Sequence, residues 1–185
     1  RGRSAHALPA AHHRLGAGVL AMITLPAALL DKENRPYVIR RYRAEDRAAL
    51  EAMYMSFEPK RGAQGLPPKE SGIARWLDGV LPHGQHVVAL VDSEVLGHGM
   101  VVPMDAGRVE LANFLHQSIR NRGIGTMVNR IAMQLARDAG AERIWLCVEP
   151  SNRAAVRSYE KAGFKRLPGS LWSPEIEMQA DLATS

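Results

Sequence analysis

The stretch Arg120-Asn121-Arg122-Gly123-Ile124-Gly125-Thr126 decides the fold, because it joins a predicted strand to a predicted helix through two closely spaced glycines. We expect the strand over Val109 to His116 and the helix over the apolar residues that follow, with Gly140 ending it. Glycines in such a turn let backbone N–H groups approach a ligand that a Cβ atom would block. The first N–H groups of a helix lack partners within it and carry partial positive charge. The turn therefore predicts a phosphate or pyrophosphate site, to which Arg120 and Arg122 add charge of the matching sign.

The glycine spacing excludes two common phosphate-binding turns. A dinucleotide-binding turn needs G-x-G-x-x-G, but Val128 occupies the third glycine position and no acidic ribose partner follows a second strand. A nucleotide triphosphatase loop needs a Gly-Lys pair, which the chain lacks. The pattern that remains is R-x-x-G-x-G after a strand.

A second segment has its own pattern. Residues Arg143 to Glu149 are β-branched, aromatic and apolar, as in a buried strand. Pro150 ends this strand, and Ser151 or Asn152 can cap a helix that begins near Arg153. We expect that helix to end at Gly163, where Phe164 starts another strand.

Together the two patterns resemble the GNAT superfamily of N-acetyltransferases. The first is similar to the family's pyrophosphate loop, Q/R-x-x-G-x-G/A. The second, with Asn152, Tyr159 and Gly163-Phe164 at the family's spacing, resembles its next signature. The resemblance covers residues from about 107 to 166, and Val38 to Tyr42 is similar to the family's first strand.

We therefore expect an α/β fold of one domain, with a mixed central β-sheet flanked by about four helices and spanning residues 37–183. Hydrophobic periodicity predicts the remaining elements. They are a strand (37–42), helices (44–56 and 69–81), a hairpin (86–92 and 95–102) and two C-terminal strands (164–168 and 175–182).

Residues 1–36 are expected to form an N-terminal extension. An apolar run from Leu15 to Leu30 is interrupted by Pro26 and is too short and broken for a membrane span. One interpretation is an extension of artificial origin or from an early start codon, with Met22 a candidate natural start. The alternative is an arm that packs on a neighbouring subunit of a homodimer.

Charge and cysteine content narrow the class of partner. The net charge is +5, and residues 1–36 carry +3 of it, so the domain is nearly neutral and offers no basic surface for nucleic acid. The single cysteine, Cys147, cannot form an intrachain disulfide, which suits a reducing cytoplasm. We expect it to be a small buried hydrophobe rather than a nucleophile. We expect no metal, because the pair His12-His13 lacks other ligands at metal-binding spacing.

The resemblance implies that acetyl-CoA is the cosubstrate and suggests which residues hold it. The turn would bind its pyrophosphate, the backbone of the preceding strand would hold the pantetheine arm and face the thioester carbonyl, and Asn152 would hydrogen-bond the pantetheine. Asn152 could also act as a plain helix cap. The expected cofactor-binding residues are Asn113, Phe114, Leu115, Arg120, Asn121, Arg122, Gly123, Ile124, Gly125, Thr126 and Asn152.

Two residues are candidates for proton transfer. Tyr159 matches the family's general acid, and a phenol stays protonated at neutral pH; the alternative is a packing tyrosine on the inner helix face. Glu110 is the acidic residue nearest the family's base in the preceding strand, although the match falls closer to Val109 and a one-residue slip changes the sheet face. His98 and His116 are alternative bases.

The expected function is transfer of the acetyl group of acetyl-CoA directly to a primary amine through a ternary complex. The acceptor, a small molecule or a protein amine, would bind near residues 53–82, as the resemblance implies. Two alternatives stay open: a catalytically silent CoA-binding module of the same fold, and a binder of another phosphorylated ligand.

Overall fold

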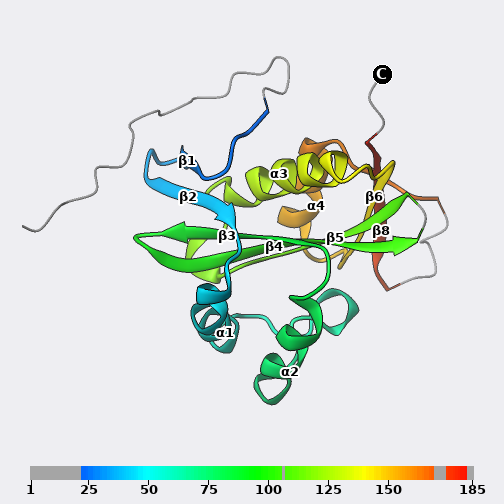
Figure 1. Ribbon diagram of the computed structural model, residues 1–185. Coiled ribbons are helices and arrows are strands. Elements are labelled where there is room, and N and C mark those ends of the chain that lie inside the picture. The colour runs from blue at the N-terminus through cyan, green and yellow to red at the C-terminus, as the bar shows by residue number, and fades with distance from the viewer. Residues whose placement is uncertain (1–21, 106, 169–173, 183–185) are drawn as a thin grey trace, which may run out of the picture.

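The computed structural model of the chain describes residues 22–105, 107–168 and 174–182 (Figure 1). These residues form one mixed sheet of eight strands in the order β1-β2-β3-β4-β5-β6-β8-β7. The strands are β1 (Ala27–Leu30), β2 (Pro36–Arg41), β3 (Gln85–Val91), β4 (Glu94–Asp105), β5 (Arg108–Leu115), β6 (Arg143–Val148), β7 (Lys165–Arg166) and β8 (Ile176–Asp181). Only β5 and β6 pair in parallel; every other neighbouring pair is antiparallel.

Four α-helices cover the two faces of this sheet, which confirms the expected fold class (Figure 1). Helices α1 (Arg47–Met55) and α2 (Glu70–Val80) lie on one face. Helices α3 (Ile124–Asp138) and α4 (Arg153–Ala162) lie on the other. No helix among the described residues is long and apolar enough to cross a membrane.

Helix α3 packs closely on the centre of the sheet. The helix lies against β3, β4 and β5, and its buried apolar positions share one core cluster with residues of β1 and β2. Gly140 ends the helix in the left-handed conformation (φ +80°). The approach depends on a glycine in β4, because a Cβ atom on Gly99 would lie 2.5 Å from Cγ1 of Val128. The helix that follows the glycine turn is thus packed closely on the sheet.

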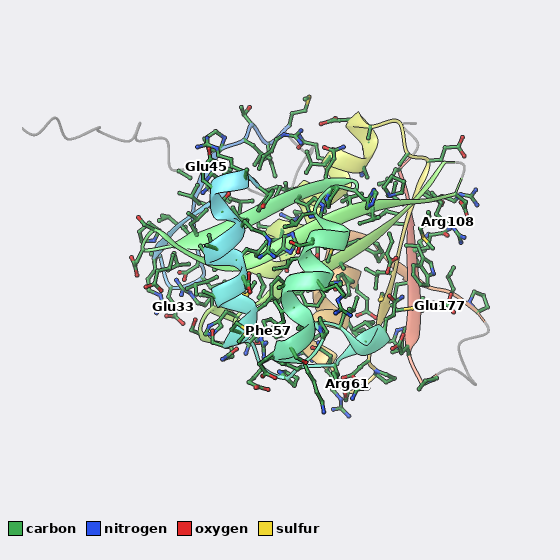
Figure 2. The ribbon with its side chains drawn as sticks, turned by 60° about the horizontal axis from the view of Figure 1, so that its bottom comes forward. Glu33, Glu45, Phe57, Arg61, Arg108 and Glu177 are labelled. Atoms are coloured by element: carbon green, nitrogen blue, oxygen red, sulfur yellow. The ribbon has the colours of Figure 1, made fainter. Side chains whose placement is uncertain are left out.

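An aromatic cluster fills the space between the sheet and helices α1 and α2. The fully buried ring of Tyr54 meets Phe57, Trp76 and Phe114 at centroid distances of 5.0 to 6.1 Å. Figure 2 shows Phe57 at the end of α1, with Arg61 in the loop that leads towards α2. This cluster supports the β5 strand from the side opposite α3.

A buried chain of hydrogen bonds runs beneath the cluster. His86 Nε2 lies 2.7 Å from the carbonyl oxygen of His83, which can only accept, so Nε2 carries the proton. The bare Nδ1 of His86 then accepts from His98 Nε2 (3.0 Å), and His98 Nδ1 accepts from the hydroxyl of Tyr54 (2.8 Å). One carbonyl therefore sets the tautomer of both neutral histidines.

The edge strand β1 was not expected, because it lies within the segment that the sequence assigned to an extension. β1 pairs with β2, so residues 27–30 belong to the same sheet as the domain. The backbone of Ile23 exchanges two hydrogen bonds with the side chain of Gln134 on α3 (2.8 and 3.1 Å). Residues 1–21 lie outside the described residues, and the role of that part stays a prediction.

We predict that the buried histidines make the protein less stable in mild acid. Burial, and to a smaller extent His86, lowers the pKa of His98 from 6.5 to about 3. The stabilisation from the neutral ring is therefore complete above pH 6.5 and is lost as the pH falls towards 3. The His98 contribution should be about 2 kcal/mol smaller at pH 5 than at pH 7, measured by urea unfolding.

The variant His98→Gln should lose most of this difference between the two pH values. His116→Gln should retain it, because the buried chain stays intact. An unchanged pH dependence in His98→Gln would contradict the assignment.

Candidate active site

A cavity of about 520 Å³ opens where β5 and β6 separate. The two strands pair only through Arg108, Val109 and Glu110 of β5, and beyond Glu110 they diverge. Four kinds of segment line the cavity. They are the β5 and β6 ends, the loop and first turn of α3 with the inner face of α4, the loop between α1 and α2 that contains the short turn Ala63–Gly65, and the turn between β1 and β2. The cavity thus joins both faces of the sheet.

The open edge of β5 presents backbone groups to this cavity. The N–H of His116 donates to the carbonyl of Leu96 beside β4 (2.9 Å), so by the alternation of a strand the backbone of Phe114 also faces β4. The backbone groups of Asn113 and Leu115 consequently face the open edge. Of the three predicted backbone positions, two therefore face the space left by β6, and Phe114 instead contributes its side chain to the aromatic cluster.

The glycine turn lies at one end of the cavity. Gly123 has a left-handed backbone (φ +89°) immediately before α3 begins, and Gly125 packs so closely that a Cβ atom would lie 3.0 Å from Leu115 Cδ1. Gly123, Gly125 and Thr126 line the cavity with Asn121. The side chain of Ile124 is fully buried in the apolar core, so only its backbone is available there.

The two arginines of the turn lie in different environments. Arg120 lines the cavity; its Nε donates to the Leu115 carbonyl (2.8 Å), it also donates to the Glu58 carbonyl, and its guanidinium lies 4.9 Å above the Phe57 ring. Arg122 is buried and its Nε donates to the carboxylate of Asp31. This corrects the expectation that both side chains add charge at the phosphate site, because the charge of Arg122 is already paired outside the cavity.

Asp31 fixes the turn between β1 and β2 against this loop. Its fully buried carboxylate accepts the backbone N–H groups of Glu33 (2.8 Å) and Arg35 (2.9 Å) as well as Arg122. Burial alone would raise the pKa of Asp31, but these donors lower it to about 2. The backbone N–H of Lys32 adds a bond to the Arg122 carbonyl (3.1 Å).

A polar cluster that the sequence analysis missed lines the cavity between α3 and α4. The side-chain amide of Asn113 donates to Asn129, whose own amide donates to Ser158 (3.2 Å). The Ser158 hydroxyl also bonds Thr126 (2.9 Å). The only signal in the sequence is a polar Asn129 among the buried apolar residues of the α3 face.

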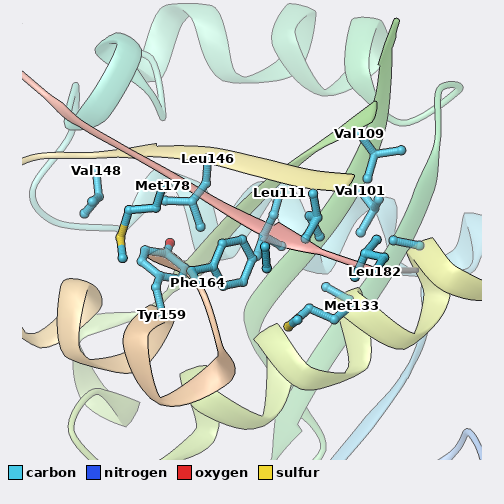
Figure 3. Packing of buried hydrophobic residues seen from close by; sticks show 14 of the residues in the cluster. Val101, Val109, Leu111, Met133, Leu146, Val148, Tyr159, Phe164, Met178 and Leu182 are labelled. Carbon is cyan, nitrogen blue, oxygen red and sulfur yellow. The ribbon is translucent and has the colours of Figure 1, made fainter. Parts of the chain in front are cut away.

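Tyr159 and Asn152 both line the cavity. Tyr159 packs edge-to-face on Phe164 (5.7 Å) within the core beneath α4 (Figure 3). Its hydroxyl has no hydrogen bond to any described residue, and burial raises its pKa further above the usual value. Asn152 caps α4 through Oδ1, which accepts the N–H of Ala155 (3.2 Å). Tyr159 therefore both packs in the core and lines the cavity, and Asn152 both caps α4 and lines the cavity.

Glu110, rather than the adjacent Val109, reaches the cavity. Val109 is buried in the core on the α3 side, whereas the half-buried Glu110 lies on the opposite face beside Gln64. Burial raises the pKa of Glu110, and a hydrogen bond from the Gln64 side chain partly opposes this. Neither alternative base lines the cavity, since His98 is fully buried and His116 Nδ1 bonds Ser118 (2.8 Å).

Cys147 is only half-buried and lines the cavity, which corrects the expectation of a fully buried side chain. Burial raises the pKa of its thiol to about 11, so it stays protonated at neutral pH and is a poor nucleophile. In the part of the chain that the structure describes, no group of three His, Cys, Asp or Glu side chains could hold a metal ion.

A match to a known protein family shows which family the chain belongs to. Residues 40–164 match the model of the acetyltransferase (GNAT) family. The chain belongs to this family. An uncharacterized N-acetyltransferase of Mycobacterium tuberculosis is 32% identical over 85 residues, which are 45% of this chain and 54% of that protein. The chain thus spans about half the length of the curated relatives that it matches.

Solved structures share the GNAT fold at low sequence identity. The GNAT domain of PAT from S. lividans superposes with a TM-score of 0.71 at 15% identity, over 84% of this chain and 96% of that one. An acetyltransferase of Salmonella typhimurium solved with acetyl-CoA gives 0.63 at 18% identity, over 80% and 95%. An aminoglycoside acetyltransferase in complex with coenzyme A gives 0.62 at 22% identity, over 78% and 94%.

We predict that Asp31→Asn destabilises the fold by about 3–5 kcal/mol, because it leaves the charge of Arg122 buried without its partner. Urea unfolding at pH 7 measures this loss. The matched control is Asp105→Asn, which removes an exposed ion pair with Arg108 and should cost about 1 kcal/mol or less. Equal small losses in both variants would contradict a structural role for Asp31.

Proposed function

We propose that the protein transfers the acetyl group of acetyl-CoA directly to a primary amine within a ternary complex. The observation that carries the proposal is the separation of β5 and β6, which leaves the backbone groups of Asn113 and Leu115 facing a cavity that also contains the glycine turn and Tyr159. The exposed edge of β5, the glycine turn and the hydroxyl-bearing Tyr159 would then act together in one cavity.

The residues present fit the donor. The unpaired N–H groups at the start of α3, together with Asn121 and Arg120, suit a pyrophosphate. The pantetheine arm would extend along the open edge of β5, with Asn152 beside it. Backbone N–H groups of β5 would stabilise the negative charge that develops on the thioester oxygen, a contribution of about 3–4 kcal/mol where such donors are fixed.

Two side chains would move the protons. Acetyl-CoA supplies an activated acetyl group, and the amine must lose a proton to attack it. Glu110, whose pKa burial raises, would accept that proton directly or through water as the new C–N bond forms. As the C–S bond breaks, the hydroxyl of Tyr159, free of other partners among the described residues, would protonate the departing sulfur.

The acceptor would bind where the α1–α2 loop meets the ends of β5 and β6. Phe57, Leu66 and Pro67 provide apolar surface there. The carboxylates of Glu110 and Glu149 would attract a cationic amine. Among the solved structures that share the fold, the aminoglycoside acetyltransferase AAC(6')-Ib has been solved with ribostamycin and coenzyme A, which supports a small-molecule amine. A protein amine is the second acceptor class to test.

Tyr159→Phe distinguishes an enzyme from a silent CoA-binding module. We expect kcat to fall by about 100-fold or more while the Kd for acetyl-CoA changes little, because the variant removes only the hydroxyl from a packed ring. The measurements are CoA release, over a panel of polyamines, aminoglycosides, amino acids and lysine peptides, and calorimetry. Unchanged turnover would remove Tyr159 as the acid, and absence of turnover on every acceptor with tight acetyl-CoA binding would favour the silent module.

Glu110→Gln tests the base through the pH profile. In the unmodified protein we expect kcat/KM to fall as the pH drops below the raised pKa of Glu110, because the protonated carboxyl cannot accept the amine proton. The variant should lose about 100-fold in rate and show no such acidic limb. Glu94→Gln, which changes an exposed residue at the start of β4, should keep the original profile, whereas an unchanged profile in Glu110→Gln would exclude this base.

A further inference from the structure

The turn between β1 and β2 brings Lys32 to the end of the cavity that holds the glycine turn. We propose that Lys32 binds a phosphate group of the CoA donor. This inference rests on the proposed function and adds a binding residue that lies outside the family patterns, 88 positions before Arg120 in the chain.

The first support is direct packing of the two segments. The Lys32 N–H donates to the Arg122 carbonyl (3.1 Å), which joins the backbone of the β1–β2 turn to that of the glycine turn. The aliphatic stem of Lys32 lies over Gly123: a Cβ atom there would be 3.4 Å from both Cγ and Cε of the lysine. The lysine therefore runs across the residue that precedes the N-terminus of α3.

The second support is that this position is rigidly held. The carboxylate of the adjacent Asp31 is buried and bonds Arg122 together with two backbone N–H groups of its own turn. The Asp31 N–H also donates to the Arg35 carbonyl (3.0 Å), closing the turn. A lysine on a fixed backbone loses less conformational entropy on binding than one on a mobile arm. Lys32 can therefore bind an anion at this end of the cavity with a small ordering cost.

The third support is the charge balance around the glycine turn. Arg122 is neutralised by Asp31, and Arg120, which keeps its charge at the cavity, already donates N–H groups to two carbonyls. Lys32 has no carboxylate within ion-pair distance among the described residues and is exposed at the cavity. On the opposite wall, Arg157 and Lys161 of α4 also line the cavity. Lys32 thus supplies the uncommitted positive charge on the β1 side of the turn.

CoA offers two phosphate groups to such a lysine: the pyrophosphate and the phosphate on the ribose 3′-oxygen. Both are recognised by the same chemistry, an ammonium acting as a point charge beside helix N–H groups. Dephospho-CoA retains the pyrophosphate and lacks the 3′-phosphate, so a comparison of the two ligands identifies which group is bound.

The experiment is isothermal titration of the full chain with CoA and with dephospho-CoA at about 0.1 M salt, where the Debye length is roughly 10 Å. The variants are Lys32→Gln, Lys32→Arg and, as the matched control, Lys165→Gln, which removes an exposed lysine of β7 outside the cavity. We expect Lys32→Gln to weaken CoA binding about tenfold, Lys32→Arg to retain most of the affinity, and Lys165→Gln to bind as the unmodified protein does. Thermal unfolding without ligand should be unchanged in all three.

Each result has a defined meaning. Weaker binding of both ligands by Lys32→Gln supports contact with the pyrophosphate, and weaker binding of CoA alone supports contact with the 3′-phosphate. Unchanged binding of both, with an unmodified protein that binds CoA, overturns the role of Lys32 and leaves the proposed function intact. An unmodified protein that binds neither ligand overturns the proposed function and this inference with it.

Discussion

The single parallel pairing in the sheet, between β5 and β6, is the constraint on which the rest of the structure depends. It lasts for three residue pairs and then ends, although both strands continue. An antiparallel partner could have paired with β5 to its end. Here α3 connects β5 to β6 across one face of the sheet, and β6 then pairs with only the first part of β5. The backbone of Asn113 and Leu115 that β6 leaves exposed, the cavity and the position of the α3 N-terminus all follow from this divergence.

A divergent sheet must be held open, because its free edge would otherwise collapse or pair. Three sets of contacts do this from different directions. The aromatic cluster around Tyr54 supports β5 from the α1–α2 side, the Asn113–Asn129–Ser158 cluster ties it to α3 and α4, and Arg120 spans from the Leu115 carbonyl to the loop after α1. Most of these are polar contacts whose partners come from distant parts of the sequence.

This distribution explains what the sequence could and could not predict. Local signals sufficed for several elements: the periodicity of α3, the glycines that end α3 and α4, and the β-branched run of β6 all agree with the structure. The edge strand β1 was not predicted. The glycine turn, Tyr159, Asn152 and Glu110 were predicted as site residues from residue pattern and family spacing, and the structure places Tyr159, Asn152, Glu110 and most of the turn around one cavity. Gln64, Asn129 and Lys32 were missed because their position depends on tertiary packing. The side chain of Arg122 was misassigned because its buried partner, Asp31, lies 91 residues earlier.

The β1–β2 hairpin has a practical consequence for how this domain is defined. The family match begins at residue 40, inside β2, and a boundary drawn there or at residue 36 would remove β1 and Asp31. A cut at residue 36 would expose β2 as a new edge, and a cut at residue 40 would remove most of β2 as well. In both cases the guanidinium of Arg122 would be left beneath the glycine turn without a counter-charge. A shortened chain cut at the family boundary would therefore lack part of the support of its glycine turn, and weak CoA binding by that shortened chain would say little about the chain that keeps the β1–β2 hairpin.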